Sequence, residues 1–318
     1  MKNLIELHLH IDGSIRPETV WDLACKQNII PDVPNLTALK KELTVPDNCA
    51  ALTQYLERFT LPLQVIQRAD AITRVTFELA EDLAAENITC AELRFAPGSC
   101  TRKGLTQAEA VEAAVYGAEQ AMLKYPQLHI GLILCCMRGE PDIYAANMET
   151  VRLAAKHLGK TVCGIDLAGA EALYPTSDYQ SLFQKASLLG IPFTIHAGEA
   201  AGPESIRKAI SFGAHRIGHG IRAVEDPALV DLLVRNSITL EICPKSNFDT
   251  KCFPDPHAYP LRKLFDAGVH VTINSDNRTV SATSLCKEIS YIQEQFHFTD
   301  TEIQKMQEYA KEALFLHL

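Results

Sequence analysis

The chain has 318 residues, 47% of them hydrophobic, and a formal net charge of −9 at pH 7. This length is enough for one barrel or two ordinary domains. The negative charge argues against nucleic acid or an anionic membrane as the main partner. No apolar run reaches the length of a membrane span, and no secretory signal precedes the first strand-like segment. The ten cysteines form no Cys-x-x-Cys pair, so we expect reduced thiols in a cytoplasmic protein.

Eight short, mostly apolar runs are typical of parallel strands that are covered on both faces. They span residues 4–8, 88–95, 129–137, 162–167, 193–196, 216–218, 238–243 and 269–275. Helical patterns lie between them at 107–123, 143–158, 179–189, 204–212, 227–234 and 259–267. This alternation predicts an α/β fold, a (β/α)8 TIM barrel, with a doubly wound open sheet as the alternative.

The connection after the first strand is unusually long. It runs over about residues 14–86 and contains helical patterns at 17–27, 50–60 and 68–85. We expect a helical insertion that covers the mouth of the barrel, within one domain that spans residues 1–318 because no linker or repeat divides the chain. Leu56 and Phe59 lie at helical spacing in this insertion. They form either an apolar wall over a ligand or the ordinary core of the insertion.

Four polar clusters stand at the ends of these strands. They are His8-Leu9-His10, His196-Ala197-Gly198-Glu199, Gly218-His219-Gly220 and Asn274-Ser275-Asp276. The active site of a barrel enzyme lies at the carboxyl ends of its strands. Side chains two positions apart on a strand point to the same side, so His8 and His10 can face one ion. With His196 and Asp276 they offer a donor set suited to Zn²⁺, and less specifically to Fe²⁺ or Mn²⁺.

Two further residues of these clusters, Glu199 and His219, remain for acid–base chemistry. Each cluster alone has a plainer interpretation. A histidine at a strand end is usually a hydrogen-bonding group, Glu199 could favour a helix N-terminus, and Asp276 could belong to a turn. Four such clusters at four strand ends are hard to obtain by chance, so the set predicts a barrel metalloenzyme that activates water.

Six longer segments contain these clusters and extend them. They are Leu7-His8-Leu9-His10-Ile11-Asp12-Gly13, Asp166-Leu167-Ala168-Gly169, His196-Ala197-Gly198-Glu199, Arg216-Ile217-Gly218-His219-Gly220, Cys243-Pro244-Lys245-Ser246-Asn247 and Asn274-Ser275-Asp276-Asn277. In this order they resemble the successive signatures of the adenosine deaminase family, within the amidohydrolase superfamily. The resemblance spans most of the chain and is highly specific as a set.

The resemblance implies a hydrolase of purine metabolism that deaminates adenosine and 2′-deoxyadenosine to the inosine products and ammonia. It implies one Zn²⁺ per chain, bound by His8, His10, His196 and Asp276, with a water at the open position. The implied partner is a small-molecule purine nucleoside. A homo-oligomer is left open.

The resemblance also implies the roles of the other site residues. Glu199 would donate a proton to purine N1, while His219 and Asp276 would handle the attacking water. Asp12 would contact the ribose 5′-hydroxyl, and the backbone amide of Gly169 would contact N3. The role of Glu199 makes physical sense, because C6 is a poor electrophile until N1 is protonated. Burial beneath a purine would raise the pKa of Glu199 and keep its proton near neutral pH.

One position departs from the family pattern. The family often has a second carboxylate after the metal aspartate, where this chain has Asn277 followed by Arg278. The resemblance implies that this residue contacts purine N7. An amide carries an N–H₂ group that can donate to N7 without a proton on a carboxylate, so we expect Asn277 to bind the purine.

Three other functions stay open from the sequence. The first is a deaminase of adenine, a nucleotide or a modified nucleoside; Asp12 favours a nucleoside because its charge would repel a phosphate. The second is an amidohydrolase with two metals bridged by a lysine at the end of strand four, but the segment there, Asp166-Leu167-Ala168-Gly169, has no lysine. The third is a non-catalytic barrel that keeps its metal. Glu199 and His219 argue against it, because neither is needed to hold zinc.

Overall fold

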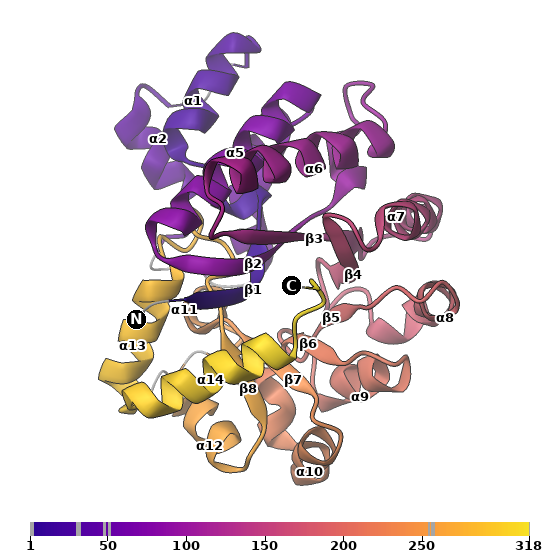
Figure 1. The fold of residues 1–318 in the computed structure, drawn as a ribbon, viewed down its shortest axis with the longest axis vertical. Helices are drawn as coiled ribbons and strands as arrows, with labels where there is room; N and C mark the ends of the chain where they lie inside the picture. Colours follow the sequence, from indigo (N-terminus) through magenta and orange to yellow (C-terminus); the bar gives the residue numbers. More distant parts are fainter. Residues whose placement is uncertain are drawn as a thin grey trace.

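Eight strands alternate with helices around a ring in the computed structural model, which describes residues 3–29, 33–46, 49, 52–253, 255 and 258–317 (Figure 1). The strands are β1 (Leu4–His10), β2 (Ile88–Phe95), β3 (His129–Met137), β4 (Val162–Ala168), β5 (Thr194–Ala197), β6 (Arg216–His219), β7 (Thr239–Ile242) and β8 (His270–Ile273). Nearly all of their residues are buried. This is why the strands are visible in the sequence as continuous apolar runs.

The strands form two parallel runs, β1-β2-β3-β4 and β5-β6-β7-β8. Two single parallel pairings join these runs: Ile165 with Phe193 between β4 and the segment before β5, and Leu9 with Asp276 between β1 and the segment after β8. The backbone N–H of His10 donates to the carbonyl of Asp276 at 2.8 Å. The ring is therefore closed, which confirms the TIM barrel and excludes the open sheet.

The outer helices follow the predicted positions within a few residues. They are α6 (Gln107–Lys124), α7 (Ile143–His157), α8 (Gln180–Leu188), α9 (Pro203–Ser211), α10 (Pro227–Arg235) and α12 (Leu261–Asp266). Thr106 begins α6 with a capping box, since its hydroxyl accepts from the backbone of Glu109 and the Glu109 carboxylate accepts from Thr106 N at 2.8 Å. The sequence patterns did not predict three further helices, α11 (Pro244–Asp249), α13 (Leu285–Phe296) and α14 (Asp300–Glu312).

Among the described residues, five α-helices lie between β1 and β2. They are α1 (Pro17–Lys26), α2 (Leu36–Leu43), α3 (Leu52–Leu56), α4 (Thr60–Val65) and α5 (Ala69–Ala85), with the short turn η2 (Glu57–Phe59) between α3 and α4. The patterns at 17–27 and 68–85 correspond to α1 and α5. The pattern at 50–60 is divided between α3 and η2, and its first two residues lie outside the described part. Figure 1 shows α1 and α2 farthest from the ring of strands.

The segment after α14 closes the amino-terminal end of the barrel, and Figure 1 shows the C-terminus within the ring. The carboxylate of Glu92 accepts hydrogen bonds from Phe315 N at 2.6 Å and Leu316 N at 2.8 Å. The guanidinium of Arg216 lies 3.8 Å from the centre of the Phe315 ring. The opposite, carboxyl-terminal end is left as the open mouth.

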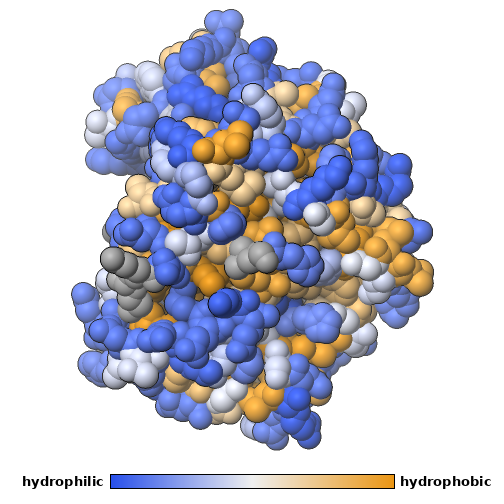
Figure 2. Space-filling model, in the orientation of Figure 1, coloured by the Kyte–Doolittle hydropathy of each residue, from blue (hydrophilic) through white to orange (hydrophobic). Residues whose placement is uncertain are grey.

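Hydrophilic residues cover most of the face in Figure 2, with smaller apolar areas between them. Such a mixture is ordinary for a folded chain, because polar groups are too few to cover the whole surface. In the part of the chain that the structure describes, no helix combines the length and the apolar character that crossing a bilayer requires.

Candidate active site

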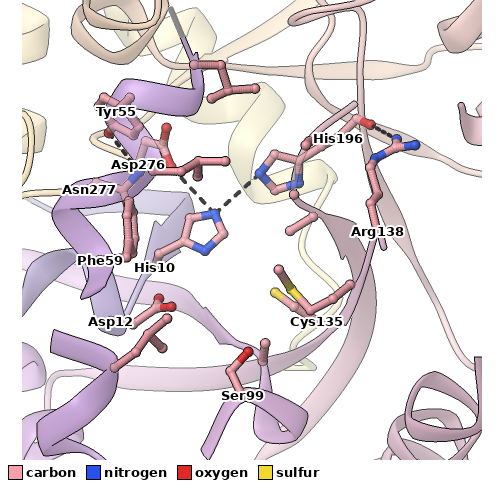
Figure 3. Close-up of a pocket in the computed structure, with 18 of the residues that line it drawn as sticks. His10, Asp12, Tyr55, Phe59, Ser99, Cys135, Arg138, His196, Asp276 and Asn277 are labelled. Atoms are coloured by element: carbon pink, nitrogen blue, oxygen red, sulfur yellow. Dashed lines mark hydrogen bonds and ion pairs between the residues drawn. The ribbon is translucent and has the colours of Figure 1, made fainter. Parts of the chain in front are cut away.

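The structure brings the four predicted metal ligands together at the open mouth. His8 and His10 lie at the end of β1, His196 lies in β5, and Asp276 follows β8 at the point where the ring closes. Figure 3 shows the side chains of His10, His196 and Asp276 converging on one point. Asp276 is held with a φ of 57°, a left-handed conformation that costs energy in a residue other than glycine. The strained backbone of Asp276 therefore directs its carboxylate into the site at a cost in stability.

The distances between the donor atoms fit one shared metal ion. His10 Nε2 lies 3.3 Å from His196 Nε2, and Asp276 Oδ1 lies 3.5 Å from both His8 Nε2 and His10 Nε2. Ligand atoms about 2.0–2.1 Å from a tetrahedral zinc are roughly 3.4 Å from one another. His8 Nε2 is buried and has no hydrogen-bond partner among the described residues. A cation bound at this point would satisfy all four donors.

A second group of donor atoms overlaps the first. His8, His219, Cys243 and Asp276 each place a donor atom within 4.8 Å of the others. Burial raises the pKa of the Cys243 thiol well above its usual range, which favours the protonated, poorly coordinating form. The group with His10 and His196 is therefore the better ligand set.

Buried carboxylates hold two of the histidine rings from behind. His8 Nδ1 lies 2.8 Å from Glu241 Oε2, and His196 Nδ1 lies 2.9 Å from Asp166 Oδ2. The hydrogen bond at His8 Nδ1 leaves His8 Nε2 without a proton and directed into the site, which is the tautomer that a metal ligand needs. The ion-pair contact of Asp166 with His196 Nδ1 favours the same tautomer at His196. These two contacts give the histidines the geometry of a built metal centre.

A buried arginine joins these two carboxylates. Arg94 donates to Asp166 Oδ2 at 3.0 Å and to Glu241 Oε2 at 2.9 Å, and all three side chains are fully buried. Burial alone would raise the pKa of Glu241, but Arg94 and Arg216 hold it well below its usual value. The sequence alone predicted no role for Arg94, Asp166 and Glu241. The available signal was a charged residue inside an apolar strand, because buried charges must be paired.

Glu199 lies beside the metal ligands with a strongly altered acidity. Its carboxyl group is buried, and Oε2 lies 3.6 Å from His219 Nε2. Burial raises its pKa to about 8, and the negative charges of Asp276 and Glu171 act in the same direction. Burial therefore favours the protonated, neutral form of this carboxyl group. The raised pKa that the sequence led us to expect is therefore present in the structure.

A chain of hydrogen bonds sets the tautomer of His219. The Tyr259 hydroxyl donates to Asn247 Oδ1 at 2.8 Å, which directs Asn247 Nδ2 toward His219 Nδ1 at 3.1 Å. Nδ1 therefore accepts a hydrogen bond, and Nε2 carries the proton on the side of the site. Burial lowers the pKa of His219 well below its usual value, so the ring is neutral. Asn247 belongs to a recognised motif but had no predicted role.

A cavity of about 360 Å³ opens beside these groups. The other predicted site residues, Asp12, Gly169 and Asn277, line it. The apolar side chains of Leu56 and Phe59 line it as well, as one of the two interpretations of these residues required. Asp12 Oδ1 is buried without a hydrogen-bond partner in the described chain, and burial raises the pKa of Asp12 to about 6. An unpaired buried acceptor that lines a cavity is a binding group for a ligand donor.

Asn277 is oriented by a residue of the insertion. Its Nδ2 donates to the hydroxyl of Tyr55 at 3.0 Å (Figure 3). That hydroxyl also lies 3.0 Å from Ser281 Oγ. Gly13 leaves the space for the amide, because a Cβ at Gly13 would meet Asn277 Oδ1 at 1.8 Å. Tyr55 therefore uses one of the two amide hydrogens of Asn277.

A parallel (β/α)8 barrel with converging His and Asp donors at its mouth, beside a buried carboxyl group of raised pKa, defines a metal-dependent hydrolase of the amidohydrolase type. Comparison with known proteins narrows the class, since residues 4–317 match the model of the family described as "Adenosine deaminase". The chain belongs to the adenosine deaminase family.

A curated relative supports this assignment, and two solved structures share the fold. An adenosine deaminase from Haemophilus ducreyi is 41% identical over 306 residues, 95% of this chain and 89% of that protein. The fold resembles an adenine deaminase from Arthrobacter aurescens with a TM-score of 0.91 at 24% identity, over 100% of this chain and 95% of that one. An N6-methyl-AMP deaminase from Arabidopsis thaliana superposes with a TM-score of 0.84 at 26% identity, over 99% and 93% of the two chains.

Proposed function

We propose that this protein hydrolytically deaminates adenosine and 2′-deoxyadenosine to the inosine products and ammonia, with one Zn²⁺ per chain held by His8, His10, His196 and Asp276. The observation that carries the proposal is Glu199, a carboxyl group whose pKa is raised to about 8 and which lies beside the converging ligands. Merely holding a metal would not require such an acid. Family membership and the identity to adenosine deaminases support the same reaction.

A bound Zn²⁺ would lower the pKa of water from about 16 toward about 7 and so supply hydroxide at neutral pH. The protein residues do the rest. Glu199 donates its proton to purine N1, which draws electrons from C6 as the oxygen adds there. The Nε2–H group of His219 donates a hydrogen bond to that oxygen. Asp276 Oδ1 faces His8 and His10, so Oδ2 is left to accept the proton of the water.

The bonds formed and broken at C6 complete the reaction. The new C–O bond gives a tetrahedral carbon that carries both oxygen and the amino group. The amino group takes the proton that Asp276 received from the water, the C6–N bond breaks, and ammonia leaves. The C6 oxygen loses its remaining proton and becomes the carbonyl of the inosine product. N1 keeps the proton from Glu199, and the proton released by the C6 oxygen restores Glu199. No oxidant or second substrate is needed.

Three residues are assigned to substrate binding. We assign Asp12 to the ribose 5′-hydroxyl, because Asp12 Oδ1 is a buried acceptor without a partner. We assign the backbone N–H of Gly169 to N3 and the amide of Asn277 to N7. All three line the cavity. A pKa of about 6 leaves Asp12 negative at neutral pH, which disfavours a 5′-phosphate, whereas the exposed Arg102 in the same lining favours one.

A substrate screen that follows the change in ultraviolet absorbance of the purine tests this assignment. The arms are adenosine, 2′-deoxyadenosine, adenine, AMP and N6-methyladenosine, with metal-loaded protein. We expect kcat/KM to be highest for the two unmodified nucleosides. Faster turnover of AMP would show that Arg102 outweighs Asp12, and faster turnover of adenine would show that the ribose contacts do not matter. Either result overturns the proposed substrate.

The remaining proposals concern the setting of the enzyme. We propose one domain over residues 1–318, in which about residues 14–86 form an insertion that covers the mouth. The presence of Leu56 and Phe59 in the cavity lining supports this. We propose a cytoplasmic location and no nucleic-acid partner, in line with the net charge of −9.

A further inference from the structure

The carboxylate of Glu171 joins two loops of the active site. Glu171 is 2% exposed and lies after β4, two residues beyond Gly169. Its oxygens accept from four successive backbone N–H groups of the loop after β5: Oε1 from Gly198 (2.7 Å), and Oε2 from Glu199 (3.1 Å), Ala200 (2.7 Å) and Ala201 (2.9 Å). One side chain thus fixes the whole loop that carries Glu199.

A fifth donor and a nearby cation complete the environment of this carboxylate. Ser205 Oγ donates to Glu171 Oε1 at 2.5 Å and lies 2.7 Å from Thr176 Oγ1. Arg138 donates to Thr176 Oγ1 at 2.9 Å and to the carbonyl of His196 at 2.6 Å. A carboxylate has acceptors only, so five donors match it, and an amide in its place would turn its N–H₂ toward some of them. Such complete pairing is what a buried anion requires.

The position of Glu171 suggests more than loop stability. Its own loop presents Gly169 to the cavity, and the loop that it binds presents Glu199. In the proposed reaction these two residues contact N3 and N1, which flank C2 on the same ring. The spacing between the two contacts must therefore match one rigid ring, and Glu171 is the side chain that spans the two loops.

We propose that Glu171 is a positioning residue that holds Glu199 in register with the backbone amide of Gly169, so that both meet one purine ring. This inference rests on the proposed function. The rival interpretation is that Glu171 only stabilises the loop before α9. The two interpretations differ in kinetics, because a positioning residue acts on the rate through Glu199, whereas a purely stabilising residue acts on the melting temperature.

The first test replaces Glu171 by glutamine. We expect kcat for adenosine to fall about 100-fold, the order of loss that a misplacement of one ångström can cause. We expect KM to change by less than about threefold and metal content to stay the same, because the ligands do not contact Glu171. Asp226→Ala is the control: it removes a carboxylate that accepts from Ala228 N and Leu229 N at the start of α10 and from Arg207, and that does not line the cavity. It should lower the melting temperature and leave kcat unchanged.

A double-mutant cycle then tests whether Glu171 acts through Glu199. In a Glu199→Gln background, Glu171→Gln should cause less than about a threefold further loss, because the positioned acid is already absent. An equal loss in both backgrounds would overturn the proposal, and so would an unchanged kcat with a lowered melting temperature. If Glu171→Gln does not fold, Glu171→Asp takes its place. It keeps a carboxylate but withdraws it by one methylene, so the same non-additivity is expected with a smaller loss.

Hydrogen exchange separates this proposal from the proposed function. The amides of residues 198–201 should exchange slowly in the wild type and much faster in the Glu171 variant, while α6 stays unchanged. This readout needs no turnover. A wild type inactive on adenosine would refute the substrate assignment, while unchanged exchange at residues 198–201 would refute the positioning role of Glu171.

Discussion

Glu241 Oε2 lies 2.8 Å from His8 Nδ1, and both side chains are fully buried. This contact fixes the ring of one proposed metal ligand from the side away from the metal. Arg94 and Arg216 also donate to this carboxylate, at 2.9 Å and 2.6 Å. The charge behind the ligand is therefore itself held in place.

We predict that Glu241→Gln weakens zinc binding about 10- to 100-fold, the usual effect of losing such an outer contact. Competition with a chelator measures it. Glu288→Gln is the control, since Glu288 is a buried carboxylate that accepts from Thr283 Oγ1 and Lys245 N and contacts no proposed ligand. Equal zinc affinity in Glu241→Gln and the wild type would contradict the role of the contact.

The acidity of Glu199 predicts the pH dependence of the rate. Its pKa is raised to about 8, and the proposed mechanism uses the protonated form. That form is present below the pKa and is lost as the pH rises through it. A bound cation lowers this pKa, so the decline in rate should begin at or below pH 8. Above that point we expect kcat/KM for adenosine to fall about tenfold per pH unit. A rate that stays constant well above pH 8 would show that Glu199 is not the acid.

Much of this site could be predicted because its signals are local. His8 and His10 alternate along one strand, and Glu199 follows His196 within one motif, so short stretches of sequence identify them. The apolar runs of the parallel strands are also local signals, and they predicted the barrel. The α11 segment is too short for a clear helical period, and α14 has an amphipathic pattern that we did not recognise.

The supporting contacts could not be predicted because they join distant parts of the chain. Glu241 is 233 positions from His8, and Tyr55 is 222 positions from Asn277. A single sequence shows that a charge in an apolar strand needs a partner, but it does not show which partner. The partner is determined only when the closed ring brings distant strands side by side.

The contact between Tyr55 and Asn277 leads to a prediction about N7. Asn277→Ala should lower kcat/KM for adenosine about 2- to 12-fold, which corresponds to one neutral hydrogen bond of about 0.5–1.5 kcal/mol. Tyr55→Phe removes the partner that orients the amide and should give a smaller loss. Kinetics with 7-deazaadenosine, which lacks the acceptor, complete the comparison. With this analogue both losses should nearly vanish; equal losses on both substrates would show that Asn277 does not contact N7.

Leu56 and Phe59 lie in the cavity wall, so we predict that they act on binding. Leu56→Ala and Phe59→Ala should each raise KM for adenosine several-fold, because apolar contact with the nucleoside is lost. The melting temperature should change little, since Leu56 is 36% exposed and neither side chain is fully buried. Thermal unfolding and steady-state kinetics on the same samples check this. A large stability loss with an unchanged KM would instead make both residues part of the ordinary core.

Replacing a metal ligand should have a different effect on zinc content from replacing the acid. Asp276→Ala should lose zinc and activity together, because Asp276 Oδ1 lies 3.5 Å from two other ligand atoms. Metal analysis after dialysis against a weak chelator measures the loss. A variant that keeps one zinc per chain would show that Asp276 is not a ligand.

The central claim is that a barrel with one bound zinc uses Glu199 to protonate adenosine. The most direct measurement compares zinc content and the rate of inosine formation in the wild type and Glu199→Gln. We predict one zinc per chain in both proteins, rapid turnover in the wild type, and a loss of at least about 100-fold in the variant, because an amide cannot give its proton to N1. A Glu199→Gln protein that retains its zinc and forms inosine at nearly the wild-type rate would contradict the mechanism.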